Sequence, residues 1–433
     1  MIERRGFRIG FATLALFTTL AGDAWRYSIT WYGWGVIVLG LAIGTGVLLV
    51  HNRARLRQLP YPMLAFLILA TASIAWSFYP GLTALGALSQ WLTTAGAVAI
   101  AVILSWEELL TALGLALRLV LGLSIVFELV VSVFIRHRIL PLWVDYGDTE
   151  HLPKLLFWSR NLLFVTGKIQ GIVGNSSTLA IIALFGLIVF GIQLASRTVR
   201  RTWGIVWLLL AAAIVVFTRS GTIYVAVVVC AVVLAAILVL RRARARRRTK
   251  AAYWSVGAFF AACGVFVAVF NEQLLQLIGK NDTLTGRDEI WRAVIDLAQQ
   301  RPVQGWGWIS YWAPWVEPFK DLVKRAGVQQ LHAHNAWLDV WLQLGLIGVA
   351  IFLALVLTVV ARSWMLAVHR PQDAVGASLL PILILAALLV QSFAESRILV
   401  EYGWVLLTVL AVKTKASEPV PLAARRAGAN AVT

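Results

Sequence analysis

Three short polar motifs interrupt a largely apolar sequence with residues that could bind an anion or accept a proton. The first places Arg219 between Thr218 and Ser220, at the junction of two apolar segments. A charged side chain beside hydrocarbon is costly unless it is paired or faces water. Arg219 is therefore a candidate anion ligand, although an arginine that extends to the lipid headgroups would fit the same position.

The second motif, residues 284–292, carries Arg287 directly after Gly286. We predict that this polar turn leads into an amphipathic helix and that Arg287 binds an anion. Asp288 and Glu289 follow at once, so they could instead pair with Arg287 or favour the start of the helix.

The third motif, residues 331–338, contains two histidines before a long apolar segment. Asn335 suits a helix N-cap, because its side chain can accept a backbone N–H that lipid could not satisfy. Histidine titrates near neutral pH, so His334 or His332 could take a proton from a sugar hydroxyl. The alternatives are an interfacial histidine without a catalytic role and a metal site, but we see no third ligand nearby and expect no metal.

Apolar segments long enough to cross a membrane separate these motifs. The 433 residues are 60% hydrophobic and 13% charged, unlike a soluble domain. The apolar segments are 9–21, 29–50, 61–78, 82–104, 109–135, 172–195, 203–217, 222–240, 252–270, 336–361, 374–391 and 400–412. We predict an all-α integral membrane protein of about 12 transmembrane helices, with residues 1–433 as a single polytopic domain.

The net charge of +18 follows from topology rather than from nucleic-acid binding, because the basic residues lie in short loops. With a cytoplasmic N-terminus, the basic segments 4–8, 53–57, 197–201 and 241–250 all lie inside, as does a cytoplasmic tail, 413–433. The start could be a signal peptide, but we interpret it as the first membrane helix. This alternation leaves a first periplasmic loop, 136–171, and a large helical periplasmic loop, 271–335, outside.

Helix starts at the outer face could bind a phosphate group. The spans after Gly171, Gly221 and Asn335 would each present an N-terminus there, with free N–H groups and partial positive charge. Together with Arg219 and Arg287, they would hold a diphosphate without a divalent ion. The candidate substrate contacts are Arg160, Lys168, Asn175, Thr222, Tyr311, His332 and Asn335.

The donor should be a membrane lipid, because the sequence has no Gly-rich nucleotide loop and no compact Asp-x-Asp cluster. An aromatic stretch in the large loop could stack on sugar rings or lie in the lipid headgroup belt, and we favour the belt. Its members are Trp306, Trp308, Tyr311, Trp312 and Trp315.

Taken together, these motifs resemble those of the O-antigen ligase and polymerase superfamily of bacterial inner membranes. The similar stretches are residues 171–175, 218–221, 285–291, 302–307, 334–335 and 344–348. The resemblance implies a GT-C-like fold in the inner membrane of a Gram-negative bacterium, with both termini cytoplasmic. Residues 174–177 depart from the form often found there, which leaves that part of the donor site open.

The resemblance also implies an activity. An O-antigen ligase transfers a polysaccharide from undecaprenyl diphosphate to the lipid A-core oligosaccharide at the periplasmic face, with inversion and without metal or cofactor. Arg219 and Arg287 would hold the diphosphate, and His334 would activate the acceptor hydroxyl or orient the donor.

Other functions remain open from the sequence. An O-antigen polymerase and a protein oligosaccharyltransferase of the same superfamily would share these motifs. A transporter or flippase for a lipid-linked sugar would need ionisable residues along a path through the membrane. Apart from Arg118, the span centres are nearly free of charge, which favours chemistry at one face.

Overall fold

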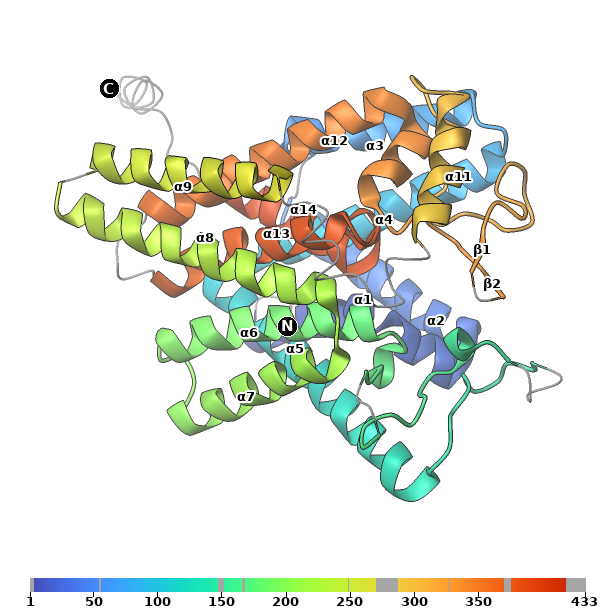
Figure 1. The fold of residues 1–433 in the computed structure, drawn as a ribbon, viewed down its shortest axis with the longest axis horizontal. Coiled ribbons are helices and arrows are strands. Elements are labelled where there is room, and N and C mark those ends of the chain that lie inside the picture. The colour runs from blue at the N-terminus through green and yellow to red at the C-terminus, as the bar shows by residue number, and fades with distance from the viewer. Residues whose placement is uncertain are drawn as a thin grey trace.

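The computed structural model describes residues 4–53, 56–146, 152–165, 168–247, 249–269, 287–325, 327–369 and 375–417. The beginning of the predicted large loop, 271–286, and the end of the predicted cytoplasmic tail, 418–433, lie outside these residues. Long helices run side by side, and the segment that contains α11, β1 and β2 lies at the opposite end from the turn between α8 and α9 (Figure 1).

Each apolar segment expected from the sequence overlaps one helix. These are α1 (Arg5–Leu20), α2 (Gly22–His51), α3 (Tyr61–Ala72), α4 (Pro80–Ile103), α5 (Trp106–Val130), α6 (Ser176–Ala195), α7 (Arg201–Thr218), α8 (Gly221–Ala245), α9 (Thr249–Val269), α12 (Ala336–His369), α13 (Val375–Ser392) and α14 (Glu401–Ala416). Among the described residues, 7 helices are long and apolar enough to cross a membrane: α2, α4, α5 with the π turn that follows it, α6, α7, α8 and α12. The chain is thus a helical, multi-pass membrane protein.

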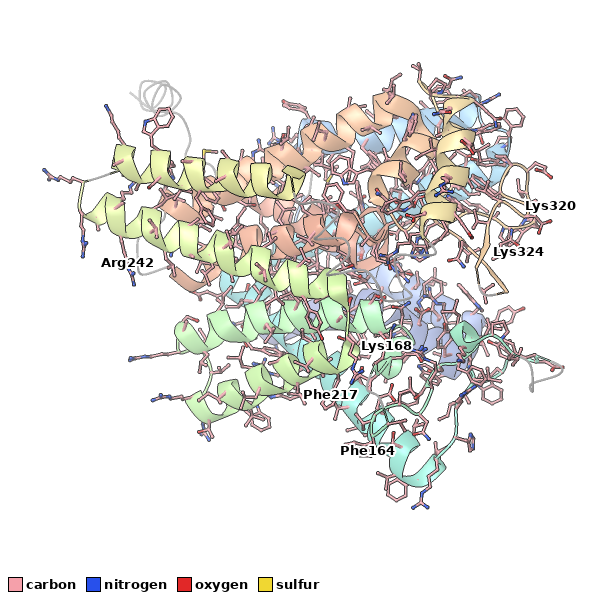
Figure 2. All side chains as sticks on the ribbon, in the orientation of Figure 1. Phe164, Lys168, Phe217, Arg242, Lys320 and Lys324 are labelled. Carbon is pink, nitrogen blue, oxygen red and sulfur yellow. The ribbon has the colours of Figure 1, made fainter. Side chains whose placement is uncertain are left out.

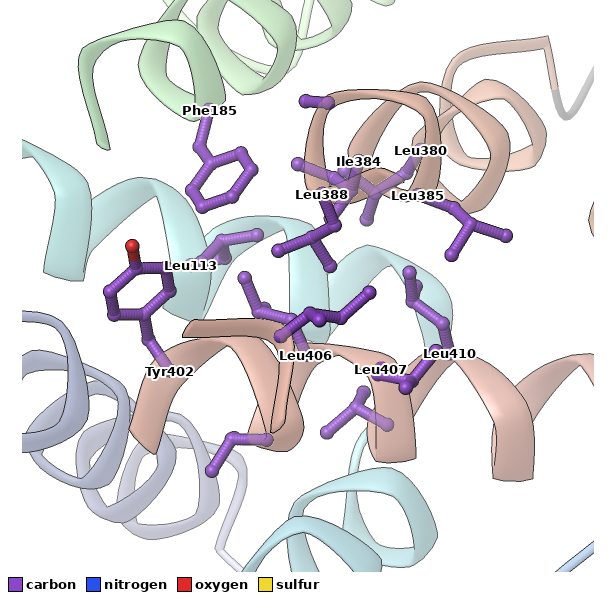
Figure 3. Packing of buried hydrophobic residues seen from close by; sticks show 14 of the residues in the cluster. Leu113, Phe185, Leu380, Ile384, Leu385, Leu388, Tyr402, Leu406, Leu407 and Leu410 are labelled. Atoms are coloured by element: carbon purple, nitrogen blue, oxygen red, sulfur yellow. The ribbon is translucent and has the colours of Figure 1, made fainter. Parts of the chain in front are cut away.

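The protein core lies where α5, α6, α13 and α14 meet. Leu113, Phe185, Leu388 and Leu406 come from these four helices and point into one apolar cluster (Figure 3). Most residues of the most apolar stretch of α2, by contrast, are not buried in the protein. The division between a packed interior and an apolar exterior is what a lipid-embedded helical bundle requires.

Basic side chains lie at both ends of the bundle. Arg242, in the last turn of α8, lies at one end, and Lys320 and Lys324 of the large loop lie at the other (Figure 2). Lys168 and Phe217 lie toward the end that carries the large loop (Figure 2). Both predicted outer loops therefore share an end, and the assignment of that end to the periplasm stays a prediction from the charge pattern.

The described part of the large loop consists of α11 (Arg287–Gln299), a long turn and a short antiparallel pair, β1 (Lys324–Arg325) and β2 (Val328–Gln329), in which Lys324 is opposite Gln329. The turn docks on a break in α12. The N–H of Trp306 donates to the carbonyl of Leu342 at 3.0 Å, and the N–H of Leu346 donates to the carbonyl of Pro302 at 2.8 Å. Two of the motifs seen in the sequence, 302–307 and 344–348, are thus one structural unit.

The first outer loop is held by a buried carboxylate at the end of α5. Glu128 Oε1 accepts the N–H of Gln170 at 2.9 Å and that of Gly171 at 2.8 Å. Gly171 and Gly174 then adopt left-handed φ angles of +58° and +64°. For this reason α6 begins at Ser176 rather than at residue 172 as predicted, and residues 171–173 form a 3-10 turn before it.

The aromatic stretch of the large loop lies mainly inside the protein. Trp306, Trp308 and Trp312 are buried. Trp308 packs edge-on against Phe66 with the ring centroids 5.4 Å apart. The prediction that these tryptophans lie in the headgroup belt is therefore wrong, because the turn that carries them docks onto α12. Trp315 alone of the four tryptophans is exposed.

Candidate active site

His334 lies between a carboxylate and an amide. Its Nδ1 is 3.0 Å from Glu395 Oε2, and its Nε2 is 3.0 Å from Gln330 Oε1. The other carboxylate oxygen of Glu395 accepts a hydrogen bond from Arg287 Nη2 at 3.1 Å. One carboxylate thus joins two residues that the sequence predicted to act together. We call Arg287, His332, His334 and Glu395 the histidine cluster.

The start of α12 sets the position of His334. Asn335 is the predicted N-cap, and its Oδ1 accepts the backbone N–H of Trp337 at 3.0 Å and that of Leu338 at 3.3 Å. His334 directly before it has a left-handed φ of +50°. The chain therefore turns sharply at the histidine before it enters the helix.

A buried aspartate ties this turn to the segment that carries Glu395. Asp339 Oδ2 accepts the backbone N–H of Ala333 at 3.0 Å and also the hydroxyl of Ser396. Because Ala333 precedes His334 and Ser396 follows Glu395, a single oxygen holds both chain segments in register. Trp337 Nε1 donates to Ser392 Oγ at 3.1 Å and adds a second link.

The charges of the histidine cluster influence each other. Burial alone would raise the pKa of Glu395, but His334, His332 and Arg287 outweigh it and hold this pKa well below its usual range. Burial, helped by the neighbouring His334, holds the pKa of His332 well below its usual value. At neutral pH, Glu395 is therefore ionised and His332 is neutral.

Tyr311 and a second group of charged residues lie near His332. Its Nδ1 accepts the backbone N–H of His334 at 3.1 Å, and its ring centroid is 6.0 Å from that of Tyr311. The Tyr311 hydroxyl accepts a hydrogen bond from Arg397 Nη1 at 2.7 Å. Arg397 also pairs with Glu401. The predicted substrate contacts Tyr311 and His332 thus lie between two arginines, Arg287 and Arg397.

The remaining predicted residues gather in a different group. Arg160 Nε donates to Gln170 Oε1 at 2.9 Å, and the N–H of Lys168 donates to the carbonyl of Phe217, in the last turn of α7 (Figure 2). Asn175 Oδ1 caps α6 through the N–H groups of Ser177 and Thr178. We call Arg160, Lys168, Asn175, Arg219 and Thr222 the loop group.

Arg219 occupies the turn between α7 and α8, with a left-handed φ of +49° and an exposed side chain. Thr222 follows in the first turn of α8 and is partly buried. The contacts recorded for the described residues do not join Arg219 to the histidine cluster. The structure therefore brings Arg287 and His334 together at Glu395 and places Arg219 with Lys168.

The start of α2 lies between the two groups. A Cβ built on Gly174 would be 2.7 Å from the Tyr27 ring, so this ring rests on the turn before Asn175. The adjacent Arg26 reaches Glu401, with Nη2 3.4 Å from Oε1. Glu401 also pairs with Arg397. Charged contacts therefore run from Arg397 through Glu401 to Arg26 in α2.

Several residues of this site were not found from the sequence. Glu395 and Arg397 belong to a short polar break between the last two apolar segments, and Asp339 lies within an apolar one. The sequence does contain a signal for Glu395 and Arg397. The predicted topology puts residues 392–399 on the outer side, and two opposite charges in a short turn there indicate a functional or structural role. The sequence gives no comparable signal for Asp339, because its role depends on hydrogen bonds that form only in the folded protein.

The expectation that no third metal ligand lies near the two histidines is wrong. His332, His334 and Glu395 each offer a ligand atom, all within 4.8 Å of one another. However, Glu395 already binds Arg287 and His334, and His332 Nδ1 accepts a backbone N–H. These contacts favour proton transfer and anion binding over metal binding, and the absence of a metal stays a prediction.

Comparison with known sequences supports the resemblance suggested by the motifs. The profile of the O-antigen ligase family matches residues 206–353, a range that contains Arg219, Arg287 and His334. The match covers less than half of the chain and supports the resemblance to the O-antigen ligase and polymerase superfamily. The three candidate catalytic residues fall inside the matched range, whereas Glu395 and Arg397 fall outside it.

A curated relative supports the same superfamily. The exopolysaccharide production protein ExoQ of Rhizobium meliloti (strain 1021) is 32% identical over 157 residues. The match covers 34% of this chain and 34% of ExoQ, so the likeness extends over about a third of each protein. Members of this superfamily are glycosyltransferase-like enzymes.

Proposed function

We propose that the protein is an O-antigen ligase, a metal-independent, inverting glycosyltransferase of the inner membrane with its active site facing the periplasm. Its donor would be O-antigen linked to undecaprenyl diphosphate, and its acceptor the lipid A-core oligosaccharide. The observation that supports it most strongly is the contact of His334 with Glu395 and of Glu395 with Arg287. A candidate base, its orienting carboxylate and a cation for a leaving group thus lie together.

In the proposed reaction, the acceptor hydroxyl displaces Gln330 from His334 Nε2, and Nε2 takes the hydroxyl proton while Nδ1 keeps its hydrogen bond to Glu395. The freed oxygen attacks the anomeric carbon of the donor sugar, and the bond from that carbon to the diphosphate oxygen breaks. Undecaprenyl diphosphate leaves with the electron pair, and the proton stays on His334. Negative charge builds on the leaving group, so a preorganised arginine lowers the barrier.

Arg219 is proposed as a second ligand of the diphosphate. It is exposed next to the open N-terminus of α8, for which Ser220 provides no side-chain cap. Such helix ends attract anions. A donor that contacts both arginines would lie across the start of α2, beside Tyr27, and the loop group would then contact the same lipid-linked substrate.

This function predicts that transfer depends on His334 and Arg287. In the purified protein with lipid-linked donor and lipid A-core acceptor, His334→Ala and Arg287→Ala should each lower the transfer rate by about 100-fold or more, because one such group contributes roughly that much. His369→Ala and Arg242→Ala, which remove the same side chains at the other end of the protein, should leave the rate unchanged. Near-normal transfer by both active-site variants would rule the proposal out.

A second candidate is a polysaccharide polymerase, whose acceptor is another lipid-linked chain. The relative ExoQ favours it, since its description concerns exopolysaccharide production. The two activities separate in one experiment that supplies lipid-linked donor with or without lipid A-core. Chain growth without lipid A-core would indicate a polymerase, and product only with lipid A-core would indicate a ligase.

A further inference from the structure

Glu395 divides its carboxylate between two partners of different chemistry. Oε1 is 3.1 Å from Arg287 Nη2, and Oε2 is 3.0 Å from His334 Nδ1. Arg287 is a permanent cation, whereas His334 can gain or lose a proton. The carboxylate therefore neutralises Arg287 at the same time as it orients the imidazole.

One N–H donor of Arg287 makes no hydrogen bond to the described residues. Its side chain is only 8% exposed, and Nε is buried without a hydrogen-bond partner among the described residues. A buried donor without a partner is destabilising. An anion that reaches Arg287 would satisfy this donor and would compete with Glu395 for the guanidinium.

We propose that a bound diphosphate draws the charge of Arg287 away from Glu395, so that Glu395 serves His334 alone and makes it a stronger base only when the donor is present. This inference rests on the proposed function, because it concerns the same donor and the same histidine. Glu395 is a positioning residue in this scheme, since it acts through His334 and does not touch the substrate.

The charges around His334 are consistent with such a switch. Without an anion, Glu395 faces both His334 and Arg287, so Arg287 offsets part of the negative charge that acts on the imidazole. His332 is neutral, as its low pKa indicates. Asp339 faces the cluster from α12 and is bound to Ala333 and Ser396. Arg397 acts on His332 from the far side and is paired with Glu401. Arg287 is thus the charged neighbour of Glu395 whose ion pairing a bound anion would change.

The basicity of His334 can be measured directly. Hydrogen–deuterium exchange at the imidazole C2 position, resolved by tandem mass spectrometry, gives a pH midpoint for each histidine of the full-length protein in nanodiscs. The probe is undecaprenyl diphosphate at saturating concentration. We expect it to raise the His334 midpoint by about one pH unit, the size of shift that a neighbouring charge produces.

Three variants sharpen the test. Arg287→Gln should show the raised midpoint without lipid and no further shift with it. Glu395→Gln should show a low midpoint in both conditions. Asp288→Asn removes an exposed acidic group one residue from Arg287 and should keep the wild-type shift.

An unmoved wild-type midpoint, or no saturable binding of undecaprenyl diphosphate, overturns the inference. The transfer assay separates this outcome from failure of the proposed function. If His334→Ala abolishes transfer while the wild-type midpoint stays fixed, only the switch is wrong. If His334→Ala transfers normally, the proposed function itself is wrong.

Discussion

Glu395 connects residues that are 108 and 61 positions away along the chain, Arg287 and His334. Both of those partners are visible in the sequence, because a cation after a glycine and a histidine before a helix cap are unusual beside apolar segments. The role of Glu395, by contrast, becomes apparent only in the folded structure. Its low pKa reflects three cationic or ionisable neighbours that outweigh its burial.

The low pKa of Glu395 predicts how stability depends on pH. A carboxyl group whose folded pKa lies below its unfolded value, about 4.3 for glutamate, stabilises the fold above that value and loses this contribution as pH falls toward the folded pKa. Glu395→Gln should therefore lower the thermal unfolding midpoint of the detergent-solubilised protein at pH 7, and the gap to wild type should narrow below about pH 4. The exposed Asp288→Asn serves as the control, with a small and steady gap. A gap for Glu395→Gln that widens on acidification would contradict this account.

Elements were predicted well where the signal is local. The apolar segments form helices, and Asn335 caps α12 as expected. Local signals fail at the start of α6, where two glycines with left-handed φ delay the helix to Ser176. They also fail inside α12, because the break at Gly345 depends on a turn some 40 residues earlier in the chain.

The break in α12 gives a prediction for Gly345. Its φ of +66° and ψ of −170° suit glycine alone, and a Cβ there would lie 2.0 Å from the carbonyl oxygen of Val303. Gly345→Ala should lower the free energy of unfolding by at least about 2 kcal/mol and expose the turn 302–307 to protease. Gly191→Ala, in α6 where a Cβ meets nothing within 4 Å, should be neutral or slightly stabilising. Equal stability of the two variants would show that the turn does not constrain α12.

The whole molecule brings together segments that no local pattern connects. The histidine cluster joins α11, the start of α12 and the break after α13, while the start of α2 separates it from the loop group. Apolar length and the charge pattern predicted the helices and the shared end of the two outer loops. They could not predict that Arg287 and His334 meet through Glu395 whereas Arg219 lies beside Lys168, because these relations follow from how the helices pack.

The measurement that tests the central claim most directly is a double-mutant cycle between His334 and Glu395 in the transfer assay. If Glu395 acts on transfer through His334, the double variant His334→Ala with Glu395→Gln should transfer no more slowly than His334→Ala alone, because no imidazole is left for Glu395 to orient. Losses that multiply, so that the double variant is slower than His334→Ala by the full factor found for Glu395→Gln, would contradict the account.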